Sequence, residues 1–215
     1  MTPAEMSQIA TAFCKKAPIL PVLVVEDVQA ARPLAEALVA GGLPMLEVTL
    51  RTPAALDIIR AMAEVPGGIV GAGTLLTPDD VDAALAAGAR FGVSPGATPT
   101  LIAACQKAGL PLLPGAATAS EVMMLSELDF TVAKFFPAEA SGGAAALKAL
   151  GAPIPHMQFC PTGGVNPQNA PDYLALSNVI CAGGSWVAPA ASIKACDWAK
   201  IETLAADAAA LRAPF

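Results

Sequence analysis

The chain has few charged residues, and its acidic residues outnumber its basic ones. Of its 215 residues, 14% are Asp, Glu, Lys or Arg, and the formal net charge is −6. No part of the sequence forms the basic stripe that neutralises nucleic-acid phosphates. We therefore expect no nucleic acid among its partners. A small anionic substrate is compatible with this charge, because a few local cations and backbone donors suffice to bind one.

Long apolar runs and paired cysteines are also missing. No run approaches the roughly 20 residues that span a bilayer, and the start of the chain lacks the basic and apolar regions of a secretory signal. The five cysteines are widely spaced and form no CxxC pair. This spacing favours reduced thiols over a disulfide framework or a zinc site. These absences predict a cytoplasmic protein without a membrane segment and without a metal.

What the sequence has in plenty is apolar residues, which make up 55% of the chain. A chain of this length and composition can bury the core of one large domain. No linker or change of composition divides it. We therefore predict a single domain over residues 1–215.

Short apolar segments rich in β-formers recur along the chain at intervals of about 20 to 25 residues. They begin near residues 20, 44, 68, 90, 111, 131, 156 and 178. Helix-like stretches lie between them, and those that start at Thr52, Thr77 and Thr98 open on Thr-Pro. This dipeptide is typical of a capping threonine followed by proline in the first turn of a helix.

Eight alternations of strand and helix predict parallel strands joined by crossover helices. Strands that are covered on both faces read as continuous apolar runs, as these do. The fold class is therefore α/β, and the economical architecture is a (β/α)8 TIM barrel with residues 1–17 as an extra helix across its bottom. An open doubly wound sheet is the competitor, but it would carry a glycine fingerprint after the first strand, where this chain has VVEDVQ.

In such a barrel, chemistry gathers at the carboxyl ends of the strands. Glu47 and Arg51 lie at the end of the second expected strand, and Thr74 follows the third. Lys134 interrupts the apolar run TVAKFFPAE. Buried charges are costly to desolvate unless they are paired. One interpretation is a structural ion network inside the barrel, and the other is a lysine nucleophile with a carboxylate that carries protons.

The second interpretation has a specific physical basis. A lysine amine attacks a carbonyl only when it is neutral, and its ordinary pKa is about 10.4. Apolar neighbours such as Phe135 and Phe136, and a nearby cation such as Arg51, would disfavour the ammonium form. The resulting iminium would act as an electron sink, and Glu47 would move protons. Arg51 would also suit the carboxylate of a substrate.

Two Gly-Gly pairs follow the last two expected strands, in CPTGGVNP and CAGGSWVAP. Loops at these positions of a (β/α)8 barrel frequently bind phosphate through backbone N–H groups. Thr162 and Ser185 could add hydroxyl groups. Simple turns are the alternative. The single histidine, His156, opens the seventh expected strand at the opposite end, and we expect a structural role for it.

Six motifs together, EVTLRT, GAGT, SPG, KFFPAE, FCPTGG and GGSW, occur in an order and spacing that resembles the bacterial 2-keto-3-deoxy-6-phosphogluconate aldolase family. The similarity runs over roughly residues 15–200. Members of this family also cleave 4-hydroxy-2-oxoglutarate. The resemblance implies a class I aldolase, a lyase without cofactor or metal, which is usually a homotrimer and works in the Entner–Doudoroff pathway.

The resemblance also implies a role for each matching residue. Lys134 would form the Schiff base with pyruvate, and Glu47 would be the acid/base. The remaining residues would contact the substrate at its carboxylate, along the pocket wall or at its phosphate, and they are Arg51 and Thr74 (carboxylate), Pro95, Phe135 and Thr162 (wall), and Gly163, Gly164, Gly184 and Ser185 (phosphate).

Substrate choice among close relatives stays open. The galactonate-specific relatives tend to end the first strand with a basic residue, whereas this chain has Val25–Glu26. That difference favours cleavage of 2-keto-3-deoxy-6-phosphogluconate to pyruvate and glyceraldehyde 3-phosphate. The alternatives are a 2-keto-3-deoxy-6-phosphogalactonate aldolase, a phosphosugar isomerase or decarboxylase that uses Lys134 only electrostatically, and a phosphosugar-binding barrel without turnover.

Overall fold

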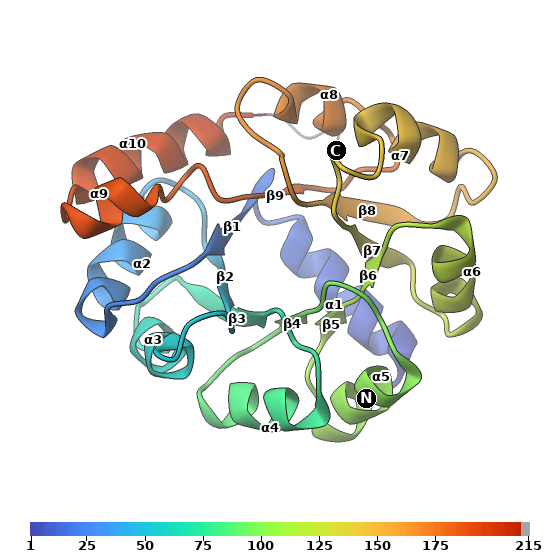
Figure 1. Ribbon diagram of the computed structural model, residues 1–215, viewed down its shortest axis with the longest axis horizontal. Helices are drawn as coiled ribbons and strands as arrows, with labels where there is room; N and C mark the ends of the chain where they lie inside the picture. Colours follow the sequence, from blue (N-terminus) through green and yellow to red (C-terminus); the bar gives the residue numbers. More distant parts are fainter. Residues whose placement is uncertain (212–215) are drawn as a thin grey trace.

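The computed structural model describes residues 1–211, in which strands and helices alternate around a ring (Figure 1). The strands are β1 (Ile19–Leu23), β2 (Met45–Thr49), β3 (Ile69–Gly73), β4 (Gly92–Val93), β5 (Leu112–Leu113), β6 (Gly115–Ala116), β7 (Val132–Phe135), β8 (Gln158–Pro161) and β9 (Ala182–Gly184). The helices are α1 (Pro3–Cys14), the 3-10 turn η1 (Val28–Ala30), α2 (Ala31–Ala40), α3 (Ala55–Ala63), α4 (Pro78–Ala86), α5 (Pro99–Ala108), α6 (Ala119–Glu127), α7 (Gly143–Gly151), α8 (Ala170–Leu174), α9 (Ala190–Lys194) and α10 (Trp198–Ala209).

The strands close into a barrel. One sheet runs in the order β5-β4-β3-β2-β1-β9 and a second in the order β6-β7-β8, and their strand pairs are parallel. Only Pro114 separates β5 from β6, so these two strands share one position of the ring. Isolated parallel bridges, Phe159↔Val179 and Thr162↔Gly183, join the β8 side to the β9 side. The predicted (β/α)8 barrel is thereby confirmed.

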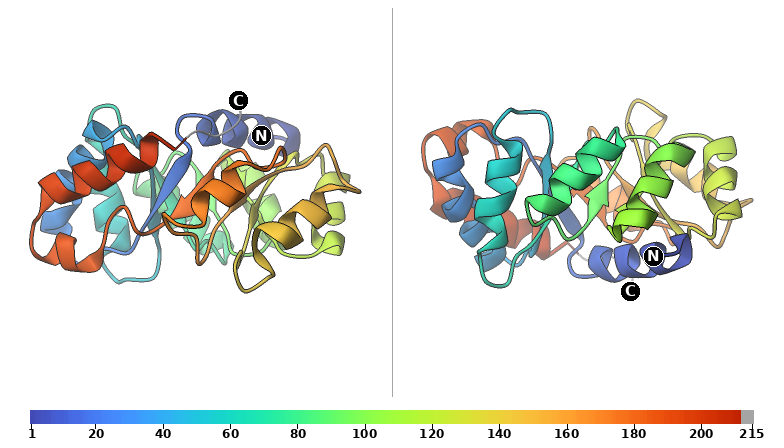
Figure 2. Two further views of the ribbon diagram at one scale, coloured as in Figure 1. Left: turned by 90° about the horizontal axis from the view of Figure 1, so that it is seen from above. Right: turned by 90° about the horizontal axis from the view of Figure 1, so that it is seen from below.

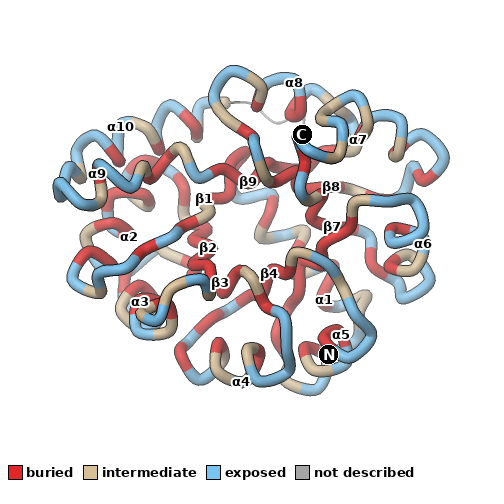
Figure 3. The backbone as a smooth tube through the Cα atoms, viewed as in Figure 1, coloured by how far each residue is buried: buried red, intermediate tan, exposed pale blue. Residues whose placement is uncertain are grey.

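Alternation along each strand divides the side chains between two layers. In β2, Leu46 and Val48 belong to the outer core between strands and helices, whereas Met45 belongs to an inner cluster on the floor of the barrel. Glu47 therefore faces inward, with Thr49 two residues further along the same strand. The red strands and the pale outer sides of the helices in Figure 3 show that the barrel wall is buried on both faces.

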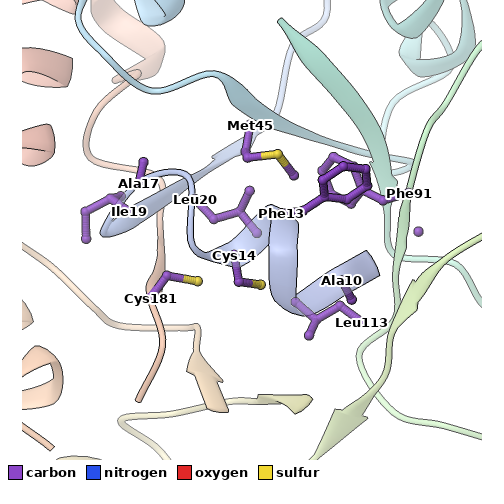
Figure 4. Close-up of a pocket in the computed structure, with 11 residues that line it drawn as sticks. Ala10, Phe13, Cys14, Ala17, Ile19, Leu20, Met45, Phe91, Leu113 and Cys181 are labelled. Carbon is purple, nitrogen blue, oxygen red and sulfur yellow. The ribbon is translucent and has the colours of Figure 1, made fainter. Parts of the chain in front are cut away.

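The extra N-terminal helix covers the bottom of the barrel, as predicted (Figure 2). Its Phe13 ring lies against the Phe91 ring, with centroids 5.9 Å apart. Figure 4 shows Ala10, Phe13 and Cys14 of α1 facing strand residues across a small apolar cavity of about 20 Å³. None of the helices within residues 1–211 is long and apolar enough to cross a membrane.

The Thr-Pro signals located two helix starts correctly and a third incorrectly. Thr77 and Thr98 cap α4 and α5 by accepting hydrogen bonds from the backbone three residues on. Thr52, however, does not cap a helix, because α3 begins at Ala55. Its hydroxyl donates to the carbonyl oxygen of Val25 at 2.8 Å. Thr52 thus ties the loop after β2 to the loop after β1, a tertiary contact that local sequence does not reveal.

Candidate active site

A polar cavity of about 300 Å³ lies at the carboxyl ends of the strands, opposite α1. Its lining comes from the ends of β1, β2, β3, β7, β8 and β9 and from the loops that follow them: Val22, Glu47, Thr49, Arg51, Thr74, Lys134, Phe136, Thr162, Gly163, Gly164, Val165, Gly183 and Ser185. This is the end of a (β/α)8 barrel at which active sites occur.

A lysine and a glutamate form a buried pair at the base of this cavity. Lys134 Nζ lies 3.3 Å from Glu47 Oε1, and the two side chains are 7% and 1% exposed. The other carboxylate oxygen, Glu47 Oε2, is buried and accepts no hydrogen bond from residues 1–211. A closed structural ion network would satisfy both oxygens, because unpaired buried acceptors are costly. Oε2 is therefore an acceptor that residues 1–211 leave unused, on a side chain that lines the cavity.

Gly73 makes the space that the Glu47 side chain occupies. It pairs with Thr49 across the β2–β3 ladder. A Cβ atom added to Gly73 would lie 2.7 Å from Glu47 Cγ and 2.9 Å from Cδ, closer than such atoms approach in proteins. The second glycine of the GAGT motif thus allows the carboxylate to lie against the strand wall and face Lys134.

The aromatic wall of the cavity is Phe136. The Lys134 ammonium lies 5.1 Å from the centroid of its ring, within range of a cation–π contact. Phe135, which the resemblance assigned to the pocket wall, is 1% exposed and packs in the outer core. The reason is strand alternation, because a strand that turns Lys134 inward turns Phe135 outward. The structure therefore corrects that assignment from Phe135 to Phe136.

Arg51 is exposed at the mouth of the cavity, where a neighbouring threonine orients it. Its Nε donates to Thr49 Oγ1 at 3.2 Å, and that hydroxyl donates to the carbonyl oxygen of Leu23 at 2.9 Å. Arg51 forms no salt bridge with a residue of the described chain. A guanidinium held in this way suits a bidentate contact with an incoming carboxylate.

Thr74 has a backbone conformation that β-branched residues rarely adopt. Its φ is +64°, in the left-handed region, and such strain costs about 1–3 kcal/mol where the surroundings hold it in place. The Leu75 N–H, which donates to the carbonyl oxygen of Val93, anchors the following residue. Strained residues of this kind cluster at ligand sites, and Thr74 lines the cavity. Pro95 does not, although the resemblance assigned it to the wall.

The first Gly-Gly pair forms a turn that only glycine adopts readily. Gly163 and Gly164 have φ angles of +99° and +81°. The carbonyl oxygen of Gly164 accepts hydrogen bonds from the side-chain amides of Asn166 and Asn169, at 3.2 and 3.1 Å. Both glycines line the cavity, so their backbone forms one wall of it.

The two glycines of the second pair face in different directions. A Cβ on Gly183 would lie 2.9 Å from Thr162 Cγ2, whereas one on Gly184 would lie 2.6 Å from Cη2 of the Trp186 ring. Gly183 lines the cavity together with Ser185, and Gly184, the expected residue, does not. Trp186 accordingly packs on the side of Gly184, beside the turn.

The buried thiols belong to the floor and the outer wall of the barrel. Hydrogen bonding with Cys14 and Cys160, together with burial, raises the pKa of the Cys181 thiol well above its ordinary value. Burial raises the pKa of Cys105 to about 11. Both thiols are therefore protonated at neutral pH and are poor nucleophiles. Within residues 1–211, no group of three or more His, Cys, Asp and Glu side chains could hold a metal ion.

Several residues that line the cavity were not predicted from the sequence. Phe136 could have been found by counting in steps of two from Lys134, and Gly183 by counting back in the same way from Ser185. Val22 and Val165 carry no chemical signal in the sequence. The single histidine, His156, is exposed and hydrogen-bonds with Ser126 Oγ at 2.7 Å.

The chain is similar to known proteins over most of its length. The model of the KDPG and KHG aldolase family matches residues 10–204. The 2-dehydro-3-deoxy-phosphogluconate aldolase of Pseudoalteromonas atlantica is 53% identical over 194 residues, which are 90% of each chain.

Solved structures of similar proteins superpose over nearly the whole chain. The 2-keto-3-deoxy-6-phosphogluconate aldolase of Zymomonas mobilis with 3-phosphoglycerate has a TM-score of 0.93 at 48% identity and covers 97% of this chain and 98% of its own. The KDPG aldolase of Legionella pneumophila, with pyruvate captured as a covalent carbinolamine, has a TM-score of 0.90 at 44% identity and covers 93% and 98%.

Proposed function

Since this chain belongs to the KDPG and KHG aldolase family, we propose that it cleaves 2-keto-3-deoxy-6-phosphogluconate to pyruvate and glyceraldehyde 3-phosphate through a Schiff base on Lys134. The activity is that of a carbon–carbon lyase, with 4-hydroxy-2-oxoglutarate as a second substrate. The observation that carries the proposal is the buried Lys134–Glu47 pair with the unpartnered oxygen Oε2, set at the base of a polar cavity.

The reaction begins at the amine. Lys134 Nζ transfers a proton to the neighbouring Glu47 Oε1, and the neutral amine attacks the C2 carbonyl carbon of the substrate. A carbinolamine forms, and Glu47 returns the proton to its hydroxyl group, which leaves as water to give the iminium and a free Glu47 carboxylate. The carbinolamine captured in the Legionella protein is the adduct that precedes such an iminium, and it supports this order of steps.

Bond cleavage then needs one proton to move twice. Glu47 takes the proton of the C4 hydroxyl while the C3–C4 bond breaks, and the electron pair of that bond passes into the iminium to give an enamine. Glyceraldehyde 3-phosphate leaves, and Glu47 returns the proton to C3. Water hydrolyses the second iminium and releases pyruvate. General catalysis of this kind contributes about 10²–10⁴-fold to the rate.

The ends of the substrate are held by different walls of the cavity. Arg51 and Thr74 hold the carboxylate beside the reacting carbon, and Phe136 covers the imine. The phosphate lies at the other end, against the backbone N–H groups of the two Gly-Gly pairs and the hydroxyl of Ser185. The proposed phosphate contacts are Gly163, Gly164, Gly184 and Ser185, with Thr162 between the two ends.

Three further properties belong to the proposal. The iminium is itself the electron sink, so the mechanism calls for no cofactor or metal. The resemblance supports a cytoplasmic homotrimer that acts in the Entner–Doudoroff pathway. We also propose that residues 1–215 form a single domain.

Reductive trapping tests the proposal. Sodium borohydride with pyruvate should inactivate the protein and add the mass of a reduced pyruvyl group to the peptide that contains Lys134. Lys134→Ala should abolish both labelling and cleavage, whereas Lys148→Ala, which changes an exposed lysine on α7, should leave both intact. Full activity of Lys134→Ala would overturn the mechanism. Parallel assays on the gluconate and galactonate substrates, which differ at C4, decide between those two aldolase activities.

A further inference from the structure

Four side chains lie behind the Gly163–Gly164 turn and take no part in lining the cavity. They come from the loop after β7, from the loop after β8 and from α8, and we call them the turn anchor: Glu139, Asn166, Asn169 and Tyr173. The inference below rests on the proposed function, because it concerns how the phosphate end of the substrate is recognised.

The loop after β7 continues the barrel's pairing past the end of the strand. The Ala138 N–H donates to the carbonyl oxygen of Thr162 at 2.8 Å, and the Glu139 N–H donates to that of Gly163 at 3.0 Å. The Glu139 side chain then lies directly over Gly164, where an added Cβ would be 2.5 Å from its Cγ and 2.7 Å from its Cβ. Two features therefore require glycine at position 164: its left-handed backbone conformation and its close packing against Glu139.

A phenol holds the other end of that side chain. The Tyr173 hydroxyl donates to Glu139 Oε1, and Tyr173 is fully buried in α8, although Glu139 itself is exposed. Burial, and then the hydrogen bond to Glu139, raises the pKa of Tyr173. The phenol thus stays protonated and remains a donor throughout the physiological range. A hydrogen bond to a charged acceptor is among the stronger ones in proteins.

The two asparagines hold the carbonyl of the turn. Their amides bind the Gly164 oxygen, and neither of them lines the cavity. That carbonyl is thereby turned towards the amides and away from the cavity, where its dipole would repel an anion. The turn keeps its N–H groups available for an anion, as in other glycine-rich phosphate sites.

From these contacts we propose that Glu139 is a positioning residue that, through Tyr173, fixes the Gly163–Gly164 turn for the phosphate and so sets the preference for phosphorylated over unphosphorylated keto acids. Its carboxylate does not touch the substrate. Its negative charge would oppose an anion if it were free, and the hydrogen bond from Tyr173 holds it on the outer side of the turn.

The test measures, in the same variants, binding at the phosphate end of the substrate and chemistry at its pyruvate end. Tyr173→Phe and Glu139→Ala should each raise KM for 2-keto-3-deoxy-6-phosphogluconate, and the inhibition constant of inorganic phosphate, by about tenfold. The exchange of pyruvate methyl protons in D₂O needs Lys134 and Glu47 but no phosphate, and it should change by less than about twofold. Glu139→Gln keeps an acceptor oxygen for the phenol and should lie closer to the wild type.

Two controls separate positioning from general damage. Glu127→Ala, which changes an exposed glutamate on α6, should match the wild type in every assay. Both substitutions remove the same hydrogen bond. In the double variant Glu139→Ala/Tyr173→Phe, KM and the phosphate inhibition constant should therefore rise no further than in the more impaired single variant. Additive losses, an unchanged phosphate inhibition constant, or an equal fall in pyruvate exchange would each overturn the inference.

Failure of the inference is distinguishable from failure of the proposed function. If the wild-type protein neither traps pyruvate nor cleaves the phosphorylated substrate, the proposed function is wrong. If the wild type does both and the variants lose both readouts equally, only the positioning role of Glu139 is wrong.

Discussion

The floor and the mouth of the barrel interior are built on the same strands, yet they differ in every chemical respect. On β7, Val132 belongs to the apolar floor and Lys134, two residues further, to the polar cavity. On β2, Met45 and Glu47 repeat the contrast. The floor encloses about 20 Å³ beneath α1, whereas the mouth encloses about 300 Å³.

The difference shows that burial alone does not make a reactive site. Cys181 on the floor and Glu47 at the mouth are both almost fully buried. The thiol lies among apolar residues and other thiols, which keep it protonated. The carboxylate has a cation as neighbour and an open cavity beside it. A buried ionisable group becomes useful where a counter-charge stabilises it and a substrate can reach it.

The largest expected effect comes from placing a charge on the floor. Met45→Glu puts a carboxylate two residues before Glu47, on the same strand and with the same inward direction, but without a cation beside it. We expect the free energy of unfolding to fall by about 3–5 kcal/mol, the usual cost of an unpaired buried charge. Urea denaturation measures it, with Met45→Leu as the control for packing. A loss below about 1 kcal/mol would show that the floor is more polar than its side chains indicate.

The next effect comes from removing the charge at the mouth. Glu47→Gln keeps the shape of the side chain but can no longer accept the C4 hydroxyl proton. We expect kcat to fall by about 100-fold or more, the usual size of general catalysis, while borohydride trapping of pyruvate continues at a reduced level. Steady-state kinetics measures the fall. A variant within about tenfold of the wild type would count against Glu47 as the proton carrier.

A smaller effect should follow from filling the space beside Glu47. Gly73→Ala would place a methyl group where the carboxylate now lies, because an added Cβ falls 2.7 Å from Glu47 Cγ. We expect kcat to fall by about tenfold or more through displacement of the carboxylate, with KM for the phosphorylated substrate little changed. Gly96→Ala is the matched control, since nothing lies within 4 Å of its added Cβ. Equal kinetics for the two variants would contradict the packing argument.

The smallest effect concerns the floor thiol and pH. The folded-state pKa of Cys181 is raised above the unfolded value of about 9, so its contribution to stability is intact below pH 9 and is lost as the pH rises beyond it. Between about pH 9 and 10, one such group costs roughly 1 kcal/mol of unfolding free energy. In Cys181→Ala, the free energy of unfolding should fall by that much less over this pH range, as measured by urea denaturation at several pH values. An identical slope would show that this thiol titrates normally.

Local sequence was sufficient to predict most of the strands and several residues of the cavity. The recurring apolar segments predicted the strands because a strand covered on both faces must be apolar throughout. Glu47, Arg51, Thr74 and Lys134 stood out because charged and polar residues are rare at the ends of such runs. All four residues line the same cavity.

The errors have a common physical origin. Phe135 was preferred over Phe136, although the structure places Phe136 in the cavity, and Gly183 lines the cavity beside the predicted Gly184. Both neighbours belong to the same sequence motif. They differ only in the face of the barrel wall to which strand alternation turns each of them. Thr52 was misplaced because its hydrogen-bond partner, the carbonyl oxygen of Val25, lies in a loop that is distant in the sequence.

The sequence by itself therefore determined the class of fold, the end of the barrel where chemistry gathers and the lysine that interrupts a buried strand, because these depend on composition and period along one segment. Only the tertiary structure decided that Glu47 meets Lys134 across 87 residues of chain, that Gly73 makes space for that carboxylate, and that Glu139 and Tyr173 lie behind the glycine turn. These contacts depend on barrel closure and register, which bring together side chains whose separation in sequence carries no information about their distance in space.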